Sequence, residues 1–450
     1  MCIQTAWPVS HSKMVTSKSF SGQADEVDAM AYPRWKEELI ELGKLGRRNP
    51  VRTESSADLD LMNGLYRMEG TKESKQSKEY VISKMKEAGL QIRIDRVGNI
   101  FARKEGKKTT RGAVMSGSHL DSVLNGGMFD GPLGVISALE AVRRLADQGF
   151  ENKRAIEAVA FMGEEGSAFR KVLLGSFALI GKISTEEALA IKNDEGMTLK
   201  DALDNLSLHG DFTLDLGKVE YFIETHVEQG PVLDKEKISI GIVENITGLT
   251  WVNTTLTGQE NHAGTTPMNA RKDALVAAAE IVQLVNRRAK ETALALGGST
   301  VATVGKLIVR PGAPNIVPGT VEMGIDIRDA NLSVMQNLQK EIIAAIRSLE
   351  NRYGVGSRIE IPFEHSPKPC SQEVTQAIAK AASSLGIRTR RMSSGAGHDA
   401  QNMAEKVKTA MIFVPSIGGI SHSPLEWTNW EDIENGIRVL TETMRILSQQ

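Results

Sequence analysis

Cysteine is almost absent from this sequence of 450 residues, which contains only Cys2 and Cys370. Because Cys2 lies in a terminal segment, we predict no structural disulfide and expect a reducing compartment, the cytoplasm. Long hydrophobic runs are also missing: no stretch of about 18 consecutive apolar residues exists, so we expect no membrane-spanning helix. Residues 1–30 lack the apolar core of a signal peptide, and we interpret them as a disordered extension or a wrongly assigned start.

An excess of charge of either sign is missing as well. Lys and Arg number 54 and Asp and Glu number 56, which leaves a formal net charge of −2. We therefore expect neither nucleic acid nor a membrane surface as a partner. Hydrophobic residues make up 41% and charged residues 24%, a globular balance that excludes a mainly disordered chain, a collagen and a coiled coil. At about 150 residues per domain, the chain has room for two or three domains.

Three common catalytic signatures are missing from the sequence. There is no Gly-x-Ser-x-Gly motif, which weakens the case for a serine hydrolase of the α/β type. There is neither a Walker A loop nor a Gly-x-Gly-x-x-Gly motif after a predicted strand. The glycine-rich segment 393–399 contains no lysine that would hold a phosphate. The chemistry must therefore come from other residues.

Short apolar runs alternate with amphipathic helical patterns on both sides of a central segment. The predicted helices cover residues 32–46, 74–88, the segment after Gly131, 371–385 and the segment from Trp430. The predicted strands cover residues 91–95, 99–103, 113–117, 155–162, 219–224 and 409–414. This alternation predicts an α/β fold, a helix-flanked, mixed and largely parallel sheet.

The pattern changes at about residue 248. The predicted elements there are strand 251–257, helix 273–290, strands 300–309 and 320–327, helix 333–350 and an extended run at 358–362. Their order, β-α-β-β-α-β, is the split βαβ arrangement. We therefore predict an inserted α+β domain over 248–362, within a catalytic domain formed by 31–247 and 363–450.

Histidine is scarce, with eight residues, and most of the histidines lie at strand ends or in loops rich in Gly, Ser or Thr. These are His119, His226, His262, His398 and His422. Any one of them alone is well explained as a hydrogen-bonded loop residue. Several beside acidic residues indicate a ligand site, because such sites gather at the carboxyl ends of strands in α/β sheets.

Two aspartates stand near the first of these histidines. His119 and Asp121 are two residues apart and share a side of an extended chain, so Asp121 can partner the second nitrogen of a metal-bound His119. Asp130 lies between glycines that let the backbone approach another group closely. It can bridge two cations there. The alternatives are a polar strand end for the first pair and a helix N-cap for Asp130.

Two adjacent carboxylates, Glu164 and Glu165, end another predicted buried strand. Like charges so close need a cation or a proton. One can bind a metal while the other takes a proton from metal-bound water, and the alternative is a solvated turn. His226 and His422 lie on glycine-flanked loops without a cysteine nearby. Nitrogen and oxygen donors fit Zn²⁺, Mn²⁺, Co²⁺ or Ni²⁺ and exclude a structural thiolate site.

Seven motifs, taken in chain order, resemble those of the amidohydrolases that cleave N-carbamoyl amino acids. The motifs are Gly117-Ser118-His119-Leu120-Asp121-Ser122, Gly126-Gly127-Met128-Phe129-Asp130-Gly131, Glu164-Glu165-Gly166, His226-Val227-Glu228-Gln229-Gly230, Asn261-His262-Ala263-Gly264-Thr265-Thr266-Pro267-Met268, Ser394-Gly395-Ala396-Gly397-His398-Asp399-Ala400 and Ser421-His422-Ser423-Pro424. The group includes N-carbamoyl-L-amino acid hydrolase, β-ureidopropionase, allantoate amidohydrolase and ureidoglycolate amidohydrolase, and it is related to two-metal aminoacylases and carboxypeptidases. The resemblance runs from about residue 38 to the C-terminus.

The resemblance implies two divalent metal ions per subunit, Zn²⁺ or Mn²⁺ with Co²⁺ or Ni²⁺ as alternatives. Carried over motif by motif, His119 and His226 would bind one ion. Glu165 and His422 would bind the other, and Asp130 would bridge the two. Gly163 departs from the relatives, which often carry a polar or acidic residue there, and we expect it to loosen the strand end without removing a ligand.

The resemblance also implies the catalytic and substrate-binding residues. Asp121 would orient His119, and Glu164 would be the general base. The insert would be a lid and dimerisation domain whose His262 stabilises the oxyanion, from the partner subunit of a homodimer or after closure. The implied substrate-binding residues are Gln229, His262, Asn315, Arg328, Gly397 and His398. The planar guanidinium of Arg328 suits a carboxylate, and its alternative is an ion pair with Asp329.

These expectations define a hydrolase acting on non-peptide C–N bonds of a linear ureido acid. The favoured substrate is an N-carbamoyl-L-amino acid, which yields amino acid, CO₂ and ammonia. The alternative is allantoate, with β-ureidopropionase, aminoacylase and dipeptidase activities further behind. Segments 261–268 and 394–400 resemble the allantoate branch, whereas 249–251 and 423–427 resemble the carbamoylase branch. A non-catalytic member should have lost a ligand or the base, and none is missing here.

Overall fold

The structure is a computed structural model that describes residues 33–49, 64–108, 110–298 and 300–450. The predicted disordered extension at residues 1–30, Cys2 and the first residue of the helix predicted at 32–46 lie outside the described residues. Cys370 is a free cysteine. No described helix combines the length and the apolar character needed to cross a membrane.

The main sheet of the described chain has nine strands in the order β15-β8-β17-β7-β5-β6-β4-β3, with β16 paired to β8. Its centre is parallel and consists of β17 (Lys408–Val414), β7 (Val219–Val227), β5 (Ala113–His119) and β6 (Ile156–Phe161). Around this centre lie β4 (Ile100–Lys104) and β3 (Gln91–Ile94) on one side and β8 (Ile240–Ile246), β15 (Lys368–Pro369) and β16 (Thr389–Ser394) on the other. The mixed, largely parallel sheet predicted from the sequence is confirmed.

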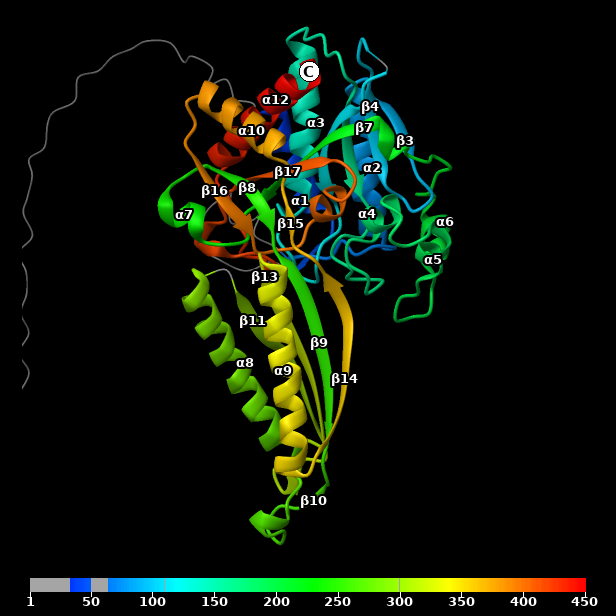
Figure 1. Cartoon of the computed structure of the whole chain (residues 1–450). Coiled ribbons are helices and arrows are strands. Elements are labelled where there is room, and N and C mark those ends of the chain that lie inside the picture. Colours follow the sequence, from blue (N-terminus) through cyan, green and yellow to red (C-terminus); the bar gives the residue numbers. More distant parts are fainter. Residues whose placement is uncertain (1–32, 50–63, 109, 299) are drawn as a thin grey trace, which may run out of the picture. The chain divides into compact units, whose positions relative to one another are not determined.

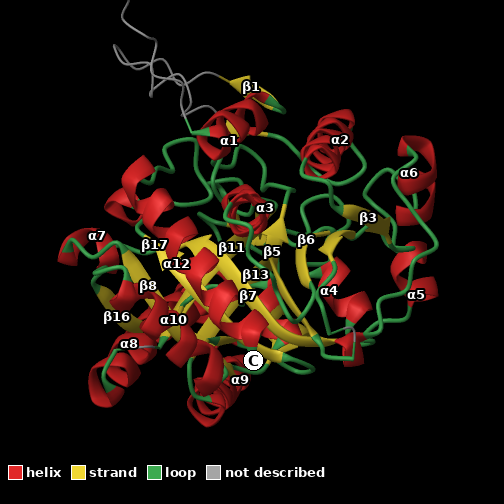
Figure 2. Ribbon diagram, turned by 90° about the horizontal axis from the view of Figure 1, so that it is seen from above, coloured by secondary structure: helices red, strands yellow, loops and turns green. Residues whose placement is uncertain are grey.

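Both faces of this sheet are buried, and successive strand residues point into different cores. On β5, Val114 belongs to one core and Met115 to the other. The first core is covered by α1 (Arg34–Lys44), α2 (Lys72–Glu87), α3 (Pro132–Asp147), α10 (Gln372–Ser384) and α12 (Trp430–Gln449). The second core includes residues of α11 (Asp399–Met403). Figure 2 shows the helices arranged around the strands.

Helix α3 illustrates how the local sequence produces this packing. Pro132 is the first residue of the helix. Its fixed φ suits the first turn, and a backbone N–H at this position would have no intrahelical acceptor, so its absence costs nothing. Val135, Leu139, Val142 and Leu145 then recur at helical spacing and are all buried. The helix begins two residues after Asp130, with Gly131 as its N-cap, and its packing therefore anchors the backbone that follows that carboxylate.

The central segment forms a second, antiparallel sheet in the order β11-β13-β9-β14. These strands are β9 (Gly248–Thr257), β11 (Val301–Arg310), β13 (Thr320–Asp329) and β14 (Gly356–His365), and α8 (Ala274–Leu296) and α9 (Leu332–Tyr353) cover one face (Figure 1). The predicted β-α-β-β-α-β order is present. The domain boundaries at 248 and 362 stay a prediction, and β14 itself continues to His365.

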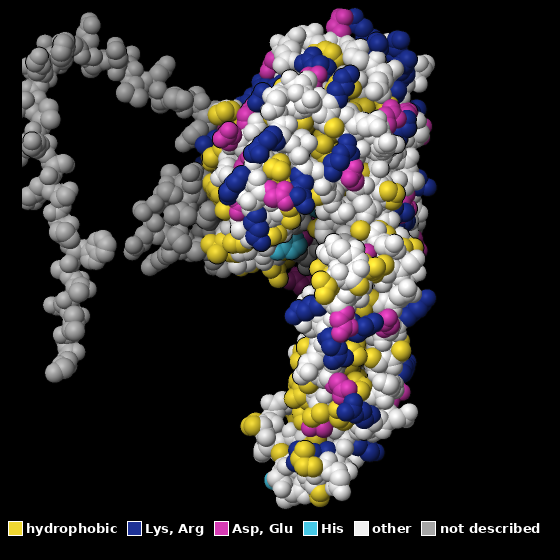
Figure 3. Space-filling view, turned by 60° about the vertical axis from the view of Figure 1, so that its left-hand side comes forward, with side chains coloured by type: hydrophobic (Ala, Val, Ile, Leu, Met, Phe, Trp, Pro, Cys, Tyr) yellow, Lys and Arg dark blue, Asp and Glu magenta, His cyan; other side chains and the backbone are white. Residues whose placement is uncertain are grey.

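The remaining elements are short. They are β1 (Arg47–Asn49), β2 (Gly64–Leu65), α4 (Leu174–Leu179), α5 (Thr185–Ala190), α6 (Leu199–Leu206), α7 (Val232–Glu236), β10 (Asn261–His262) and β12 (Ile316–Val317). The last two pair with each other as a separate ribbon. On the face shown in Figure 3, Lys and Arg side chains lie among Asp and Glu side chains.

Candidate metal centre

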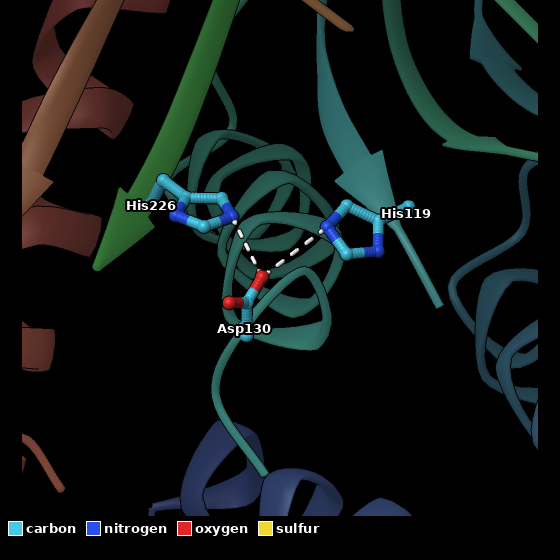
Figure 4. Close-up of side chains that lie close together, drawn as sticks. All are labelled: His119, Asp130 and His226. Atoms are coloured by element: carbon cyan, nitrogen blue, oxygen red, sulfur yellow. Dashed lines mark ion pairs between the residues drawn. The ribbon is translucent and has the colours of Figure 1, made fainter. Parts of the chain in front are cut away.

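The parallel strands of the main sheet bring the predicted ligands together at their carboxyl ends. His119 is the last residue of β5, and His226 is the last but one of β7. Glu164 and Glu165 follow the end of β6, and Asp130 precedes α3. Figure 4 shows His119 and His226 reaching toward Asp130 from two different strands.

Asp130 is the centre of this cluster. Its Oδ1 lies 3.4 Å from His119 Nε2 and 3.2 Å from His226 Nε2. Its Oδ2 lies 3.4 Å from His422 Nε2, and that nitrogen lies 3.5 Å from Glu165 Oε2. Each Asp130 oxygen therefore faces a different group of potential ligands, as a carboxylate that bridges two cations would.

The second nitrogen of each buried histidine faces a backbone carbonyl. Nδ1 of His119 lies 3.1 Å from the carbonyl oxygen of Asp121, and Nδ1 of His226 lies 2.9 Å from that of Val227. Because a carbonyl only accepts, each Nδ1 carries the hydrogen and donates it. The lone pair of each Nε2 is then free to point at a metal ion.

Several features of the cluster fit bound cations. His226 Nε2 and Glu165 Oε1 are buried and have no hydrogen-bond partner in the described structure. Four sets of described side chains have ligand atoms close enough to share an ion. Two of them match the predicted ligands: His119, Asp130 and His226, and Asp130, Glu165 and His422. The other two are His119, Glu164 and Glu165, and Glu224, His226 and His398. Buried polar atoms without partners are costly, and a divalent cation beside each of them would satisfy it. The nitrogen and oxygen donors suit Zn²⁺ or Mn²⁺.

The electrostatics of the cluster lead to the same conclusion. Burial, strengthened by the negative charge of Asp130, raises the pKa of Glu165 to about 8. Burial also holds the pKa of Glu164 well above its usual value, with Glu165 adding to the effect. Burial would lower the pKa of His119, but Glu164, Asp121 and Asp130 outweigh it and raise that pKa well above its usual range. The cluster thus retains protons where cations would otherwise balance its negative charge.

Asp121 is hydrogen-bonded to the turn that carries Glu164 and Glu165. Its carboxylate accepts the backbone N–H of Glu164 at 3.2 Å and that of Glu165 at 2.9 Å. The same carboxylate is 3.6 Å from His119 Nδ1, which is too long for a hydrogen bond. The carbonyl of Asp121 makes the contact to the imidazole instead. Orientation of His119 by the Asp121 carboxylate therefore stays a prediction.

Gly163 lies in this turn with a φ of +61°, in the left-handed region that favours glycine. Its N–H donates to the carboxylate of Glu69 at 3.0 Å. Glu69 in turn forms an ion pair with Lys78, and both side chains are buried. The backbone from residue 163 to 165 is therefore held by two buried carboxylates.

Two buried acids of the site were not assigned a role from the sequence. Glu426 accepts the N–H groups of Phe129 and Asp130, each at 3.0 Å, and the hydroxyl of Ser421 at 2.8 Å. It thereby joins the Asp130 turn to the loop of His422. Glu224 accepts the hydroxyl of Ser118 at 2.6 Å and the N–H of Ala400 at 2.8 Å. Apart from Ser421, these partners lie more than a hundred residues away in sequence from the acid that they contact, and no local pattern points to them.

The glycines around Asp130, in contrast, were recognised in the sequence as positions where the backbone approaches another group closely. A Cβ on Gly127 would meet Glu426 Oε1 at 2.3 Å. A Cβ on Gly131 would meet the His119 ring at 2.5 Å, and this residue has a φ of +86°. The close approach expected from these glycines therefore has two identified partners.

A pocket with a volume of about 240 Å³ opens beside the cluster. Its apolar lining residues are Val123, Val172, Leu173, Leu249, Trp251 and Ala396. Four of the predicted substrate-binding residues also line it: Gln229, Arg328, Gly397 and His398. Gln229 donates to Asp130 Oδ2 at 2.7 Å, and His398 Nε2 lies 2.9 Å from the hydroxyl of Ser394. The roles of these four residues stay predictions.

The pocket does not include the other two predicted residues, His262 and Asn315. They lie next to each other at the β10–β12 ribbon, where the N–H of Ala263 donates to the carbonyl of Asn315. His262 is exposed, and its Nδ1 accepts the N–H groups of Gly264 at 3.0 Å and Thr265 at 3.2 Å. Because Nδ1 accepts, the ring hydrogen is on Nε2, which is therefore a donor.

Comparison with known proteins identifies the family of the chain. Residues 115–446 match the family model described as peptidase family M20/M25/M40. The match covers well over half of the chain, and the chain belongs to this family of metal-dependent hydrolases.

Individual relatives align over nearly the whole chain. N-carbamoyl-L-amino acid amidohydrolase of Geobacillus stearothermophilus is 38% identical over 91% of this chain and 97% of its own length. Allantoate amidohydrolase of Escherichia coli is 34% identical over 88% and 96%. Among solved structures, an amidase of the hydantoinase/carbamoylase family from Burkholderia multivorans superposes with a TM-score of 0.82, at 34% identity over 93% of this chain and 98% of that one.

Proposed function

We propose that this protein hydrolyses the ureido C–N bond of N-carbamoyl-L-amino acids to amino acid, CO₂ and ammonia. The observation that carries the proposal is the composition of a single pocket. It combines the candidate metal cluster, the guanidinium of Arg328 and an apolar wall that includes Leu249 and Trp251. These parts match the ureido group, the carboxylate and the side chain of such a substrate.

The chain holds two divalent cations in this proposal, Zn²⁺ or Mn²⁺, with Co²⁺ or Ni²⁺ as alternatives. His119 and His226 would hold one, Glu165 and His422 would hold the other, and Asp130 would be shared between them. When bound, such cations act as Lewis acids that polarise a carbonyl and make a water molecule a stronger nucleophile. The fit rests on the convergent Nε2 atoms and the partnerless buried atoms described above.

Glu164 is the general base in this proposal. Its Oε2 lies at the pocket, 3.8 Å from His119 Nε2, and Asp121 holds its backbone in place. Its carboxylate would take a proton from water and pass it to the leaving nitrogen. Arg328 binds the substrate carboxylate and sets the distance between that group and the base.

His262 stabilises the oxyanion from the partner subunit of a homodimer. An oxyanion needs a hydrogen-bond donor, and the Gly264 and Thr265 amides leave His262 with its hydrogen on Nε2. The residue is exposed and lies outside the pocket of its own chain, which supports a contribution across a dimer formed through the insert. The scarcity of cysteine supports a cytoplasmic location.

Allantoate is the second candidate, because relatives named allantoate amidohydrolase are 34% identical to this chain. Arg328 suits the carboxylate of allantoate equally well. The difference lies at the wall formed by Val172, Leu173, Leu249 and Trp251. A second ureido group there would lose hydrogen bonds to water and find only apolar partners, which disfavours allantoate.

The test is ammonia release by the metal-reconstituted protein from N-carbamoyl-L-methionine, N-carbamoyl-β-alanine and allantoate in parallel, with metal-stripped protein as control. We expect the highest kcat/KM for N-carbamoyl-L-methionine, because N-carbamoyl-β-alanine has no side chain to fill the apolar wall. Allantoate as the best substrate would overturn the proposal in favour of the second candidate. Activity that survives metal removal would overturn the role of the cluster.

A further inference from the structure

We propose that Asp326 is a positioning residue of this pocket, which sets the guanidinium of Arg328 for a substrate carboxylate and the indole of Trp251 for the substrate side chain. The inference rests on the proposed function, because it concerns how that substrate is recognised. It assigns a task to an acid that neither the motifs nor the metal cluster involve.

Asp326 receives hydrogen bonds from both recognition residues. The Nε of Arg328 donates to Oδ1 at 2.9 Å, and its Nη2 donates to Oδ2 at 3.0 Å. The indole Nε1 of Trp251 donates to the same Oδ2 at 2.9 Å. One carboxylate therefore determines the orientation of two side chains that line the pocket.

The register of the second sheet explains why these residues meet. Asp326 on β13 stands directly opposite Trp251 on β9, and Arg328 stands opposite Leu249. Side chains two residues apart on a strand lie on the same face, so Asp326 and Arg328 share a face. Ile325 and Ile327, which alternate with them, are buried in the core under the helices. All three polar contacts are thus made on the face that the helices leave open.

The bonding pattern leaves part of the guanidinium free for a ligand. A guanidinium has five N–H groups. Two of them donate to Asp326, and Nη1 donates a third to the carbonyl of Gly395 at 3.1 Å. One N–H on Nη1 and one on Nη2 remain, and together they suit the two oxygens of a carboxylate. Asp326 therefore selects the edge of Arg328 that meets the substrate.

Stability alone does not account for this arrangement. The side chains of Arg328 and Asp326 are 30% and 27% exposed, and ion pairs with such access to water contribute little to folding. The arrangement does affect orientation, because a carboxylate that accepts two hydrogen bonds from a planar guanidinium restricts the rotation and tilt of that guanidinium. The expected effect of removing Asp326 is consequently on substrate binding.

The test is an Asp326→Asn substitution, which keeps the shape of the side chain and removes its charge. Glu322→Gln is the matched control, because Glu322 lies on the same strand and, within the described part of the chain, pairs only with Lys306 and Arg310, outside the pocket. The readouts are kcat and KM for N-carbamoyl-L-methionine, the melting temperature, and inhibition by [3-(methylsulfanyl)propyl]urea, the same molecule without its carboxylate.

We expect Asp326→Asn to raise KM about tenfold with kcat within about twofold, the size of effect expected when a charge-assisted contact is weakened. Asparagine keeps one side-chain oxygen that can accept the indole N–H of Trp251, so the inhibition constant of the urea and the melting temperature should match those of the parent. Glu322→Gln should match the parent throughout. An unchanged KM, or an inhibition constant that rises together with KM, would overturn the role of Asp326. A parent protein inactive on N-carbamoyl-L-methionine would instead overturn the proposed function.

Discussion

The adjacent carboxylates Glu164 and Glu165 should respond in opposite ways to the same substitution. Glu164→Gln should nearly abolish turnover while the protein keeps its fold and both cations. Glu165→Gln should lose a cation, because the amide replaces a charged ligand. The two substitutions therefore distinguish the general base from the metal ligand, although the two residues are adjacent.

The structure sets the expected magnitude. No described side chain or backbone group forms a hydrogen bond with the Glu164 carboxylate, whose shortest ionic contact is the 3.8 Å to His119 Nε2. Glutamine has the same shape, so the change in unfolding free energy should stay within about 0.5 kcal/mol. Loss of a positioned general base should lower kcat by about 10²–10⁴-fold. The KM should change little, because Arg328 still binds the carboxylate.

The assay combines ammonia release with metal analysis and thermal denaturation of each purified variant. Glu164→Gln should match the parent in metal content and melting temperature, whereas Glu165→Gln should bind fewer cations. Turnover by Glu164→Gln within about tenfold of the parent would refute its assignment as the base. Metal loss in Glu164→Gln and none in Glu165→Gln would show that the two roles are exchanged.

Three further outcomes follow from the structure. Metal-free protein should lose stability as the pH rises from about 4.5 to 8, because folded Glu165, with its pKa raised to about 8, keeps a proton that the unfolded chain has released. In denaturation experiments across that range, the difference in unfolding free energy between loaded and metal-free protein should widen. A constant difference would count against this role of Glu165. His262→Ala mixed with Glu164→Gln should regain activity through hybrid dimers, whereas no recovery after mixing would place His262 in its own subunit's site. Lys78→Met should cost about 3–5 kcal/mol by leaving Glu69 buried and unpaired, and Glu69→Gln combined with it should recover part of that loss in urea denaturation; equal losses in the single and double variants would refute the coupling.

The fold could be predicted largely because its central strands are apolar and its long helices have apolar residues at helical spacing along one face. The central strands alternate between two cores and are bounded by turns, as in β5 and β6. β16 was missed, because its sequence Thr-Arg-Arg-Met-Ser-Ser has no apolar alternation and it pairs with β8 alone. The short helices α4–α7 were missed for a similar reason, since each is too short to show a helical period.

The sequence indicated which residues converge because each stands in a recognisable local pattern: His119, His226, Glu164 and Glu165 at or just after strand ends, and Asp130 and His422 near glycines. Their division between two cations came from the family resemblance and stays a prediction. The supporting acids could not be predicted, because their partners are distant in sequence. Glu426 meets Phe129 across 297 positions, and Asp326 meets Trp251 across 75. Asp121 shows that a local spacing can also suggest a different contact from the one observed. Its spacing from His119 suggested a hydrogen bond between its carboxylate and the imidazole, whereas the carboxylate accepts the N–H groups of Glu164 and Glu165.

The most direct measurement of the central claim is product analysis of racemic N-carbamoylmethionine incubated with the metal-reconstituted protein. The account predicts that only the L-enantiomer is consumed and that L-methionine and ammonia appear in equal amounts, with none formed by Glu164→Gln. Consumption of the D-enantiomer at the same rate, or ammonia released without methionine, would contradict it.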